Sequence, residues 1–326
     1  MGEFLVRTTR SLNIPRTNFW VYYYLFAKRR LVRRSIRAFR PDVIYAHNVY
    51  DTFVSHGFGI PVVSHIHSLY TDYFLSQESS RTFLPKAYWK WFWNYRLSIE
   101  RAALSRSDLV ITYSEFLANL AKERGAKNIA IIPNGIDTSA FTPAGDKSAE
   151  FKHPAAVYVG RIEKAKGILY LLKAAKELPD INFYLIGDEK DHYDLPQNVY
   201  LLGSKDPRVI PTYLRSADIF INPVVRDGFE MVNMEAMACD LPVITTDAYE
   251  RSDLYGNSAI LVKPEDSQQI VAAVRGLLDD KALRLKLIKE GRILASQHDW
   301  SVISGSIEGL LDDTAKRHAK VLENQG

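Results

Sequence analysis

The segment RDGFEMVNMEAMACDLP, residues 226–242, gathers three carboxylates around a glycine. Asp227 comes directly before Gly228, Glu230 follows two residues after that glycine, and Glu235 follows five residues later. A glycine ahead of a helix allows a ligand to approach the free N–H groups at the helix start, which suit a phosphate. Carboxylates beside that phosphate accept hydrogen bonds from hydroxyl groups. The segment therefore predicts a site for a diphosphate with a sugar on one side and a ribose on the other.

The elements that must position this segment are short apolar strands that alternate with helices. The expected strands are 42–47, 61–67, 108–114 and 129–134, followed by 155–160, 181–187, 198–203, 218–223, 242–246 and 259–262. The expected helices are 86–105, 115–124, 167–178, 209–216, 230–239 and 266–279. Such alternation is typical of doubly wound α/β sheets. Ligands of these sheets bind beyond the carboxyl ends of the strands, so we expect the chemistry in loops that follow strands.

A polar stretch at 142–154 separates the two series of strands. It contains two prolines and a glycine and predicts an interdomain linker. We therefore expect two Rossmann-like domains that face a cleft, the first over 1–145 and the second over 146–298, with a last helix over 299–326. The length of 326 residues is sufficient for two domains.

Several segments are similar, in the same order, to the motifs of the retaining family 4 glycosyltransferases, which have the GT-B fold. Segment 226–242 resembles their acidic motif, and VGRIEKAKGI at 159–168 resembles their Gly-Arg and Lys-Gly motif. The other similar segments are IGD at 186–188, ADIFINP at 217–223, PVITT at 242–246, IIPNGIDTSAF at 131–141 and HDWS at 298–301. The resemblance covers residues from about 42 to 315. It implies a GT-B fold whose C-terminal helix crosses back to the N-terminal, acceptor-side domain, while the second domain binds the nucleotide sugar.

The resemblance also implies roles for residues at matching positions. Arg161 and Lys166 would bind the donor diphosphate, Asp227 would contact the donor sugar, and Glu235 would hold the ribose hydroxyls. The full set implied at the donor is Arg161, Lys166, Gly187, Gly228, Phe229, Glu230 and Glu235. The residues implied in catalysis are Asp227, His67, Arg161 and Lys166. The acceptor-side candidates are His47, His67 and Asn134, and His65 falls on the same side as His67 if the strand is regular.

The function implied by the resemblance is a retaining, metal-independent transfer of a sugar. The donor is a nucleoside diphosphate sugar, and the acceptor is a hydroxyl group on a lipid-linked molecule or a glycan. The donor's own phosphate would take the acceptor proton, while Arg161 and Lys166 stabilise the departing diphosphate. The sequence has no Asp-x-Asp pair, no Walker loop and no complete dinucleotide fingerprint, so we expect no metal and no cofactor besides the donor substrate.

Three features depart from the family pattern. Asp227 stands where Glu is usual, and Glu230 stands where Gly usually follows Phe229. A carboxylate at position 230 repels a diphosphate unless the side chain turns away. The strand–helix unit with which the family opens has no counterpart here, so we expect a missing segment or a partner chain to complete the first domain. The alternatives are a non-catalytic sugar-nucleotide-binding subunit and a sugar-nucleotide epimerase on the same scaffold.

The first 40 residues are strongly basic. They contain ten Lys or Arg residues and one acidic residue, a charge of +9, whereas the whole chain carries +4 and the remainder therefore −5. Within 19–40 the apolar residues of one helical face are Val21, Leu25, Val32, Ile36 and Phe39, and the basic residues of another are Arg30, Arg33, Arg34 and Arg37. Together with the basic, aromatic stretch 84–96, this pattern predicts contact with an anionic membrane surface. No nucleic-acid-binding motif accompanies the arginines, so nucleic acid is not an expected partner.

The single cysteine, Cys239, allows no disulfide within the chain and is typical of a reducing compartment. No run of about 18 apolar residues occurs, so we predict no membrane-spanning helix. These features predict a cytoplasmic protein that binds peripherally to the cytoplasmic face of a membrane.

Overall fold

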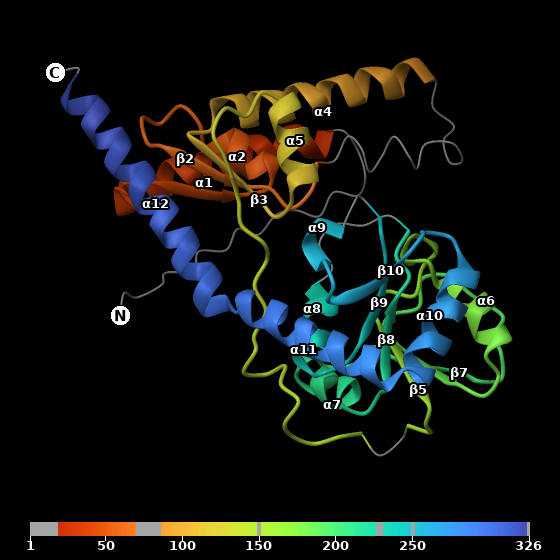
Figure 1. Cartoon of the computed structure of the whole chain (residues 1–326). Coiled ribbons are helices and arrows are strands. Elements are labelled where there is room, and N and C mark those ends of the chain that lie inside the picture. The colour runs from red at the N-terminus through yellow and green to blue at the C-terminus, as the bar shows by residue number, and fades with distance from the viewer. Residues whose placement is uncertain (1–18, 70–85, 149–150, 226–230, 249–251, 325–326) are drawn as a thin grey trace. The chain divides into compact units, whose positions relative to one another are not determined.

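The computed structural model describes residues 19–69, 86–148, 151–225, 231–248 and 252–324 (Figure 1). The chain divides into two compact units, Met1–Ile132 with Ser306–Gly326, and Pro133–Gly305. Each unit is built on a parallel sheet with helices packed on it. The predicted class, two doubly wound α/β domains, is therefore confirmed.

The first unit contains a four-stranded sheet in the order β1–β2–β3–β4, in which all neighbours are parallel. The strands are β1 (Ile44–His47), β2 (Val62–His65), β3 (Leu109–Thr112) and β4 (Ile129–Ile131). Strands β2 and β3 are buried along their whole length, as is usual for central strands of a parallel sheet. The predicted strand 61–67 was too long, because pairing with β3 ends where Ile66 N–H donates to the carbonyl of Ile111. His67 consequently lies in the loop after β2.

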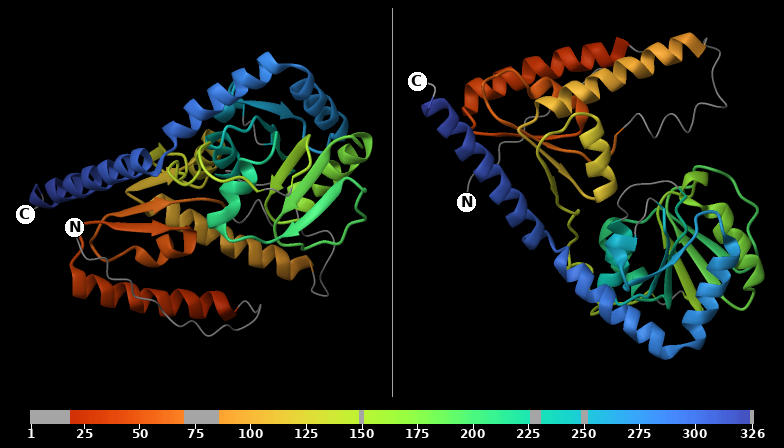
Figure 2. Two further views of the ribbon diagram at one scale, coloured as in Figure 1. Left: turned by 90° about the horizontal axis from the view of Figure 1, so that it is seen from below. Right: turned by 45° about the horizontal axis from the view of Figure 1, so that its top comes forward.

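Up to β4, the described part of the first unit has the helices α1 (Phe19–Phe39), α2 (Val49–Ser55), α4 (Lys86–Arg106) and α5 (Glu115–Glu123). Helix α2 packs against both α1 and α4 (Figure 2). Arg29 of α1 donates from Nη1 to the carbonyls of Val54 (3.2 Å) and His56 (3.0 Å). These bonds satisfy carbonyls at the end of α2 that have no partner within the helix.

The second unit contains a six-stranded parallel sheet in the order β10–β9–β8–β5–β6–β7. The strands are β5 (Ala155–Val159), β6 (Asn182–Ile186), β7 (Val199–Gly203), β8 (Ile219–Asn222), β9 (Val243–Thr246) and β10 (Ala259–Val262). Both faces of β5 are buried: Ala156 and Tyr158 belong to one core cluster, and Ala155 and Val157 to another. This alternation explains why the strand reads as a continuous apolar run.

Helices cover both faces of the second sheet. Helices α6 (Ile168–Glu177) and α10 (Ser267–Asp279) belong to the first core cluster, and α7 (Ile210–Leu214) and α8 (Met231–Ala238) belong to the second. Helix α11 (Lys281–Gln297) contributes Leu287 to one cluster and Ala295 to the other. Shorter turns of helix are η1 (Lys164–Lys166), η2 (Pro207–Val209) and α9 (Ser252–Tyr255).

The polar stretch predicted as the linker has hydrogen bonds to the second unit. Arg215 donates from Nη1 to the carbonyl of Thr142 (3.1 Å) and from Nε to that of Asp146 (2.8 Å). The division between the units falls earlier, between Ile132 and Pro133. The side chain of Arg215 therefore fastens the start of this stretch to the unit that follows it.

The last helix, α12 (Trp300–Glu323), belongs to both units. Its first residues are part of the second unit, and from Ser306 onward it is part of the first. There the ring of His318 lies 3.3 Å from the carbonyl of Gly59. The expected return of the C-terminal helix to the N-terminal domain is thus confirmed. None of the described helices is long and apolar enough to span a bilayer.

Candidate functional site

The sheet of the second unit reverses its strand order between β5 and β8. The chain adds β6 and β7 on one side of β5, and then β8, β9 and β10 on the other. Such a switch point opens a crevice at the carboxyl ends of the two strands, because the loops after them turn toward opposite faces of the sheet. Arg161 follows β5, and the segment that leads to α8 follows β8. Two of the predicted motifs therefore meet at one edge of the sheet.

Backbone contacts join these two loops directly. The N–H of Val225, after β8, donates to the carbonyl of Ala165 in η1 (3.2 Å). Gly167 ends η1 with φ of 74°, and a Cβ at this position would lie 1.9 Å from the carbonyl oxygen of Pro223. Only glycine allows both the backbone angle and this approach. The turn that carries Lys166 is thus held against the end of β8.

Gly187, directly after β6, also allows a close approach of two backbone segments. Its φ is 155°, and a Cβ there would lie 1.8 Å from the carbonyl oxygen of Gly160. The hydroxyl of Tyr158 donates to the carbonyl of Arg161 (2.8 Å) and steadies the same loop. The structure therefore gives Gly187 a packing role at this edge, and its predicted contact with the donor stays a prediction.

The two cations of this edge differ in their surroundings. The side chain of Arg161 is 54% exposed and forms an ion pair with Glu163 (3.1 Å). Lys166 is only 8% exposed. An exposed guanidinium can turn toward a diphosphate and bind it through two parallel hydrogen bonds. The assignment of both residues to the donor diphosphate stays a prediction.

Glu235 projects from the middle of α8 and has unusual surroundings for a carboxylate. Burial raises the pKa of its carboxyl group to about 7. Within the described parts of the chain, its side chain has no hydrogen bond or ion pair. A half-buried carboxyl group without a partner is a ready acceptor for ligand hydroxyls. The predicted ribose contact fits this geometry.

A buried polar network, which the sequence analysis missed, holds α8 against the sheet. Asn233 is fully buried, accepts from Nδ2 of Asn222 (2.9 Å), and donates to the hydroxyl oxygens of Thr245 (3.2 Å) and Tyr255 (2.7 Å). Thr245 in turn donates to the carbonyl of Asn222 (3.1 Å). These bonds connect the ends of β8 and β9 to the first turn of α8. The signal in the sequence was a side chain with an amide or a hydroxyl group near the end of each of these apolar strands, Asn222 in β8 and Thr245 in β9.

The remaining residues of the acidic motif, Asp227, Gly228, Phe229 and Glu230, lie outside the described residues. Asn134 belongs to the second unit and is half buried. The next residues pair with the junction of α11 and α12, where Ile136 N–H donates to the carbonyl of His298 (2.8 Å).

In the first unit, three histidines gather at the carboxyl ends of β1 and β2. His47 and His65 are direct neighbours in the register of the two strands, and His67 follows. Nδ1 of His47 lies 3.2 Å from Nε2 of His67, and the rings of His65 and His67 are 4.3 Å apart. The condition of the prediction, a regular strand through His67, is not met because β2 ends at His65, but the two rings nevertheless lie close together. The hydroxyl of Tyr45 lies 2.5 Å from Nδ1 of His65.

Burial keeps these histidines neutral. It lowers the pKa of His65 to about 3, with a further contribution from the charges of His67 and His47. Partial desolvation of their rings also lowers the pKa values of His47 and His67, which are exposed as whole residues, although the carboxylate of Asp51 opposes the shift at His47. Each imidazole therefore keeps a free nitrogen lone pair at neutral pH.

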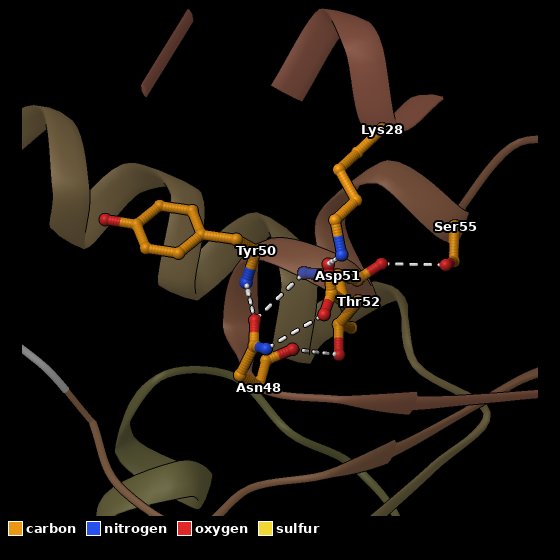
Figure 3. Close-up of polar contacts among 6 residues, drawn as sticks. All are labelled: Lys28, Asn48, Tyr50, Asp51, Thr52 and Ser55. Carbon is orange, nitrogen blue, oxygen red and sulfur yellow. Dashed lines mark hydrogen bonds and ion pairs between the residues drawn. The ribbon is translucent and has the colours of Figure 1, made fainter. Parts of the chain in front are cut away.

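The loop between His47 and α2 is fixed by its own hydrogen bonds (Figure 3). Asn48, with φ of 66°, accepts at Oδ1 from the N–H groups of Tyr50 (3.0 Å) and Asp51 (3.1 Å). Asp51 accepts from Nδ2 of Asn48 and forms an ion pair with Lys28 of α1 (3.0 Å). The end of β1 is thus tied to two helices.

Comparison with known protein families gives a match for each part of the chain. Residues 3–140 match the family described as "Glycosyltransferase Family 4". Residues 146–294 match the family described as "Glycosyl transferases group 1". Each half of the chain therefore matches a glycosyltransferase family. The family resemblance expected from the motifs is supported over both.

Among the relatives of this chain is the UDP-Gal:alpha-D-GlcNAc-diphosphoundecaprenol alpha-1,3-galactosyltransferase of Escherichia coli. It is 28% identical over 70% of this chain and 62% of its own length. The chain spans about half to three fifths of the length of the first curated relatives it matches.

Two solved structures share the fold of this chain. Sucrose-phosphate synthase from Thermosynechococcus elongatus has a TM-score of 0.75 and 22% identity, over 92% of this chain and 80% of its own. Anabaena HepE in complex with UDP has a TM-score of 0.69 and 20% identity, over 90% of this chain and 82% of its own. The predicted GT-B architecture is confirmed by both.

Proposed function

We propose that this chain is a retaining glycosyltransferase that moves a sugar from a nucleoside diphosphate sugar to a hydroxyl acceptor. The observation that carries the proposal is Glu235, a half-buried carboxyl group on α8 that has no partner among the described residues, in the helix that follows β8 at the switch point of the sheet. The family matches over both units support it. HepE was solved with UDP bound, which makes UDP the first nucleotide to test.

The chemistry assigned to the described residues is electrostatic. Arg161 and Lys166 would bind the diphosphate and stabilise its charge as it leaves, so the transfer step itself needs no metal ion. A carboxylate at Glu235 would accept hydrogen bonds from both ribose hydroxyls. The donor's phosphate would take the acceptor proton, which is compatible with retention of configuration.

Calorimetric titration of the full chain with UDP, GDP and ADP tests the donor site. We expect one of them to bind, and Glu235→Ala to weaken that binding by about tenfold or more, because a hydrogen bond to a charged group is lost. Glu308→Ala, an exposed carboxylate on α12, is the matched control. Absence of binding by all three nucleotides contradicts the proposal. Binding without sugar transfer to any hydroxyl acceptor instead supports the sugar-nucleotide-binding subunit.

The acceptor proposed is lipid-linked, as in the Escherichia coli relative, whose name specifies a diphosphoundecaprenol acceptor. The structure adds an exposed face on α1 that suits anionic lipid headgroups. Phe26 is 70% exposed, and the exposed arginines on the same face are Arg30, Arg33, Arg34 and Arg37. Arg29, on a neighbouring face of α1, donates to carbonyls at the end of α2. Arginine and aromatic side chains on one helical face are typical of interfacial helices.

Flotation with anionic liposomes tests this surface. We expect recovery of the protein at low salt, loss of recovery at high salt, and loss at low salt for the variant Arg33→Glu/Arg34→Glu. The control Lys286→Glu/Lys289→Glu makes the same charge change on the exposed side of α11 and should float like the unaltered protein. Recovery that does not depend on salt or on lipid charge contradicts membrane binding through α1.

A further inference from the structure

The three histidines at the edge of the first sheet form a cluster, whereas the sequence motifs implied only separate acceptor-side roles for His47 and His67. One ring nitrogen from each of His47, His65 and His67 lies within 4.8 Å of the other two. The pairing of β1 with β2 brings together residues that are 18 and 20 positions apart in the sequence. No short metal-binding motif spans them, which is why the sequence predicted no metal. The parallel register alone creates the cluster.

The distances suit a metal ion with imidazole ligands. Nδ1 of His47 and Nε2 of His67 are 3.2 Å apart. Two nitrogens bound tetrahedrally to Zn²⁺ at about 2.0–2.1 Å are about 3.3 Å from each other. The ligand atom of His65 lies within 4.8 Å of the other two and has to come closer to them for coordination. Tetrahedral coordination is therefore within reach of the described side chains.

The third histidine supplies an uncommitted nitrogen. His65 is 4% exposed, and its Nε2 is buried without a hydrogen-bond partner among the described residues. A buried polar atom without a partner is energetically costly, so such atoms usually have a ligand or a water as partner. The contact between His47 and His67 does not give this nitrogen a partner. A metal ion bound at the cluster would give it one.

Tyr45 is placed like the outer-shell partner of a metal ligand, within hydrogen-bond distance of the second ring nitrogen of His65. If Nδ1–H of His65 donates to the hydroxyl oxygen of Tyr45, the lone pair is left on Nε2. The carboxylate of Asp51 also acts on His47 and adds a negative charge near the cluster. Both features favour a bound cation.

We propose that His47, His65 and His67 bind a divalent transition metal ion, with Zn²⁺ as the ion that best suits three imidazoles. Imidazole nitrogens do not suit Mg²⁺ or Ca²⁺, which take oxygen ligands. Three protein ligands leave a fourth position for water or for an oxygen of a ligand. His47 and His67 are exposed, so this position is open to solvent. The site does not depend on the donor chemistry proposed above.

Cobalt titration of the chelator-treated full chain tests the site. We expect one equivalent of Co²⁺ to give the visible absorption of a tetrahedral ion, and Zn²⁺ to displace it. Competition with a chromophoric chelator then gives the Zn²⁺ affinity. Tyr45→Phe should weaken binding by about 10–100-fold, as loss of an outer-shell partner does. His65→Gln and His67→Gln should weaken it further.

The controls separate binding at the cluster from other effects. His67 is exposed in a loop, so His67→Gln leaves the fold intact even if His65→Gln does not. His192, which is 97% exposed in the second unit, is the matched control, and His192→Gln should bind Zn²⁺ like the unaltered chain. The proposal is overturned if no Co²⁺ binds, or if the His67 and His192 variants bind Zn²⁺ equally well.

Discussion

The two units place titratable side chains at the same structural position, the carboxyl edge of a parallel sheet, and treat them differently. In the second unit the carboxyl group of Glu235 has no partner among the described residues, while Asn233 of the same helix has partners at both ends of its amide. In the first unit three like groups stand together, and Nε2 of His65 has no partner among the described residues. A carboxyl group without a partner, on a helix that hydrogen bonds hold in place, suits a ligand with hydroxyl groups. A cluster of neutral bases suits a Lewis acid.

Burial acts with opposite sign on the two groups and gives the same outcome. It raises the pKa of Glu235 and lowers the pKa of each clustered histidine, because it disfavours the charged form of each. Both sheet edges therefore carry groups that lean toward neutrality near pH 7. The two units differ in the hydrogen-bond partners around these groups, and four predictions test this difference.

The largest effect is expected from Asn233→Ala, which removes the centre of the bracing network. The substitution removes three hydrogen bonds between buried side chains, those of Asn233 with Asn222, Thr245 and Tyr255. We expect the free energy of unfolding of the second unit to fall by about 3 kcal/mol. Asn94→Ala, at an exposed position of α4, is the control. Equal urea-denaturation midpoints for the two variants would show that α8 is not braced in this way.

The second effect concerns stability against pH. The pKa of Glu235 is raised by folding from 4.5 to about 7, so the folded state binds the proton more tightly than the unfolded state. Its contribution to stability is fully present below pH 4.5 and is lost as the pH rises through 7. The loss is on the order of 2–3 kcal/mol. Urea denaturation from pH 5 to 8 should show this decline in the unaltered chain and not in Glu235→Gln. Parallel curves would mean that Glu235 is solvated like an ordinary carboxylate.

A smaller effect on stability is expected in the first unit, from substitutions of Asn48 before α2. Asn48→Ala removes the cap of α2 and forces a side chain into the positive φ of 66°, whereas Asn48→Gly removes only the cap. We expect the alanine variant to be less stable than the glycine variant by about 1 kcal/mol. Thermal unfolding followed by circular dichroism measures the difference. The opposite order would contradict the described loop conformation.

The smallest effect is expected from Lys28→Met. The ion pair of Lys28 with Asp51 is partly exposed, with about 30% of each side chain accessible to solvent. Pairs of this kind contribute at most about 1 kcal/mol, and salt screens them. We expect a small decrease in the unfolding temperature at low salt that disappears at high salt. A large decrease that persists at high salt would show that Lys28 acts through packing.

Much of this architecture was predictable because parallel strands and glycine turns leave clear patterns. The ten expected strands, the long basic helix and the return of the last helix are all present. Glu235 was found through its spacing in a motif. The network of Asn233 was missed because its partners come from three different elements, and a pattern along the chain does not reveal pairing across them. The histidine cluster was seen only in part, since the register of β1 and β2 decides that His47 faces His65.

The close backbone contacts at Gly187 and Gly167 limit what a shared sequence motif can show about function. At each position a methyl group would overlap a backbone oxygen of a neighbouring strand end. Selection for folding alone would keep glycine at both sites, whatever the enzyme transfers. A relative that shares these glycines therefore shares the shape of the sheet edge, and its donor has to be inferred from residues that the fold leaves free to vary.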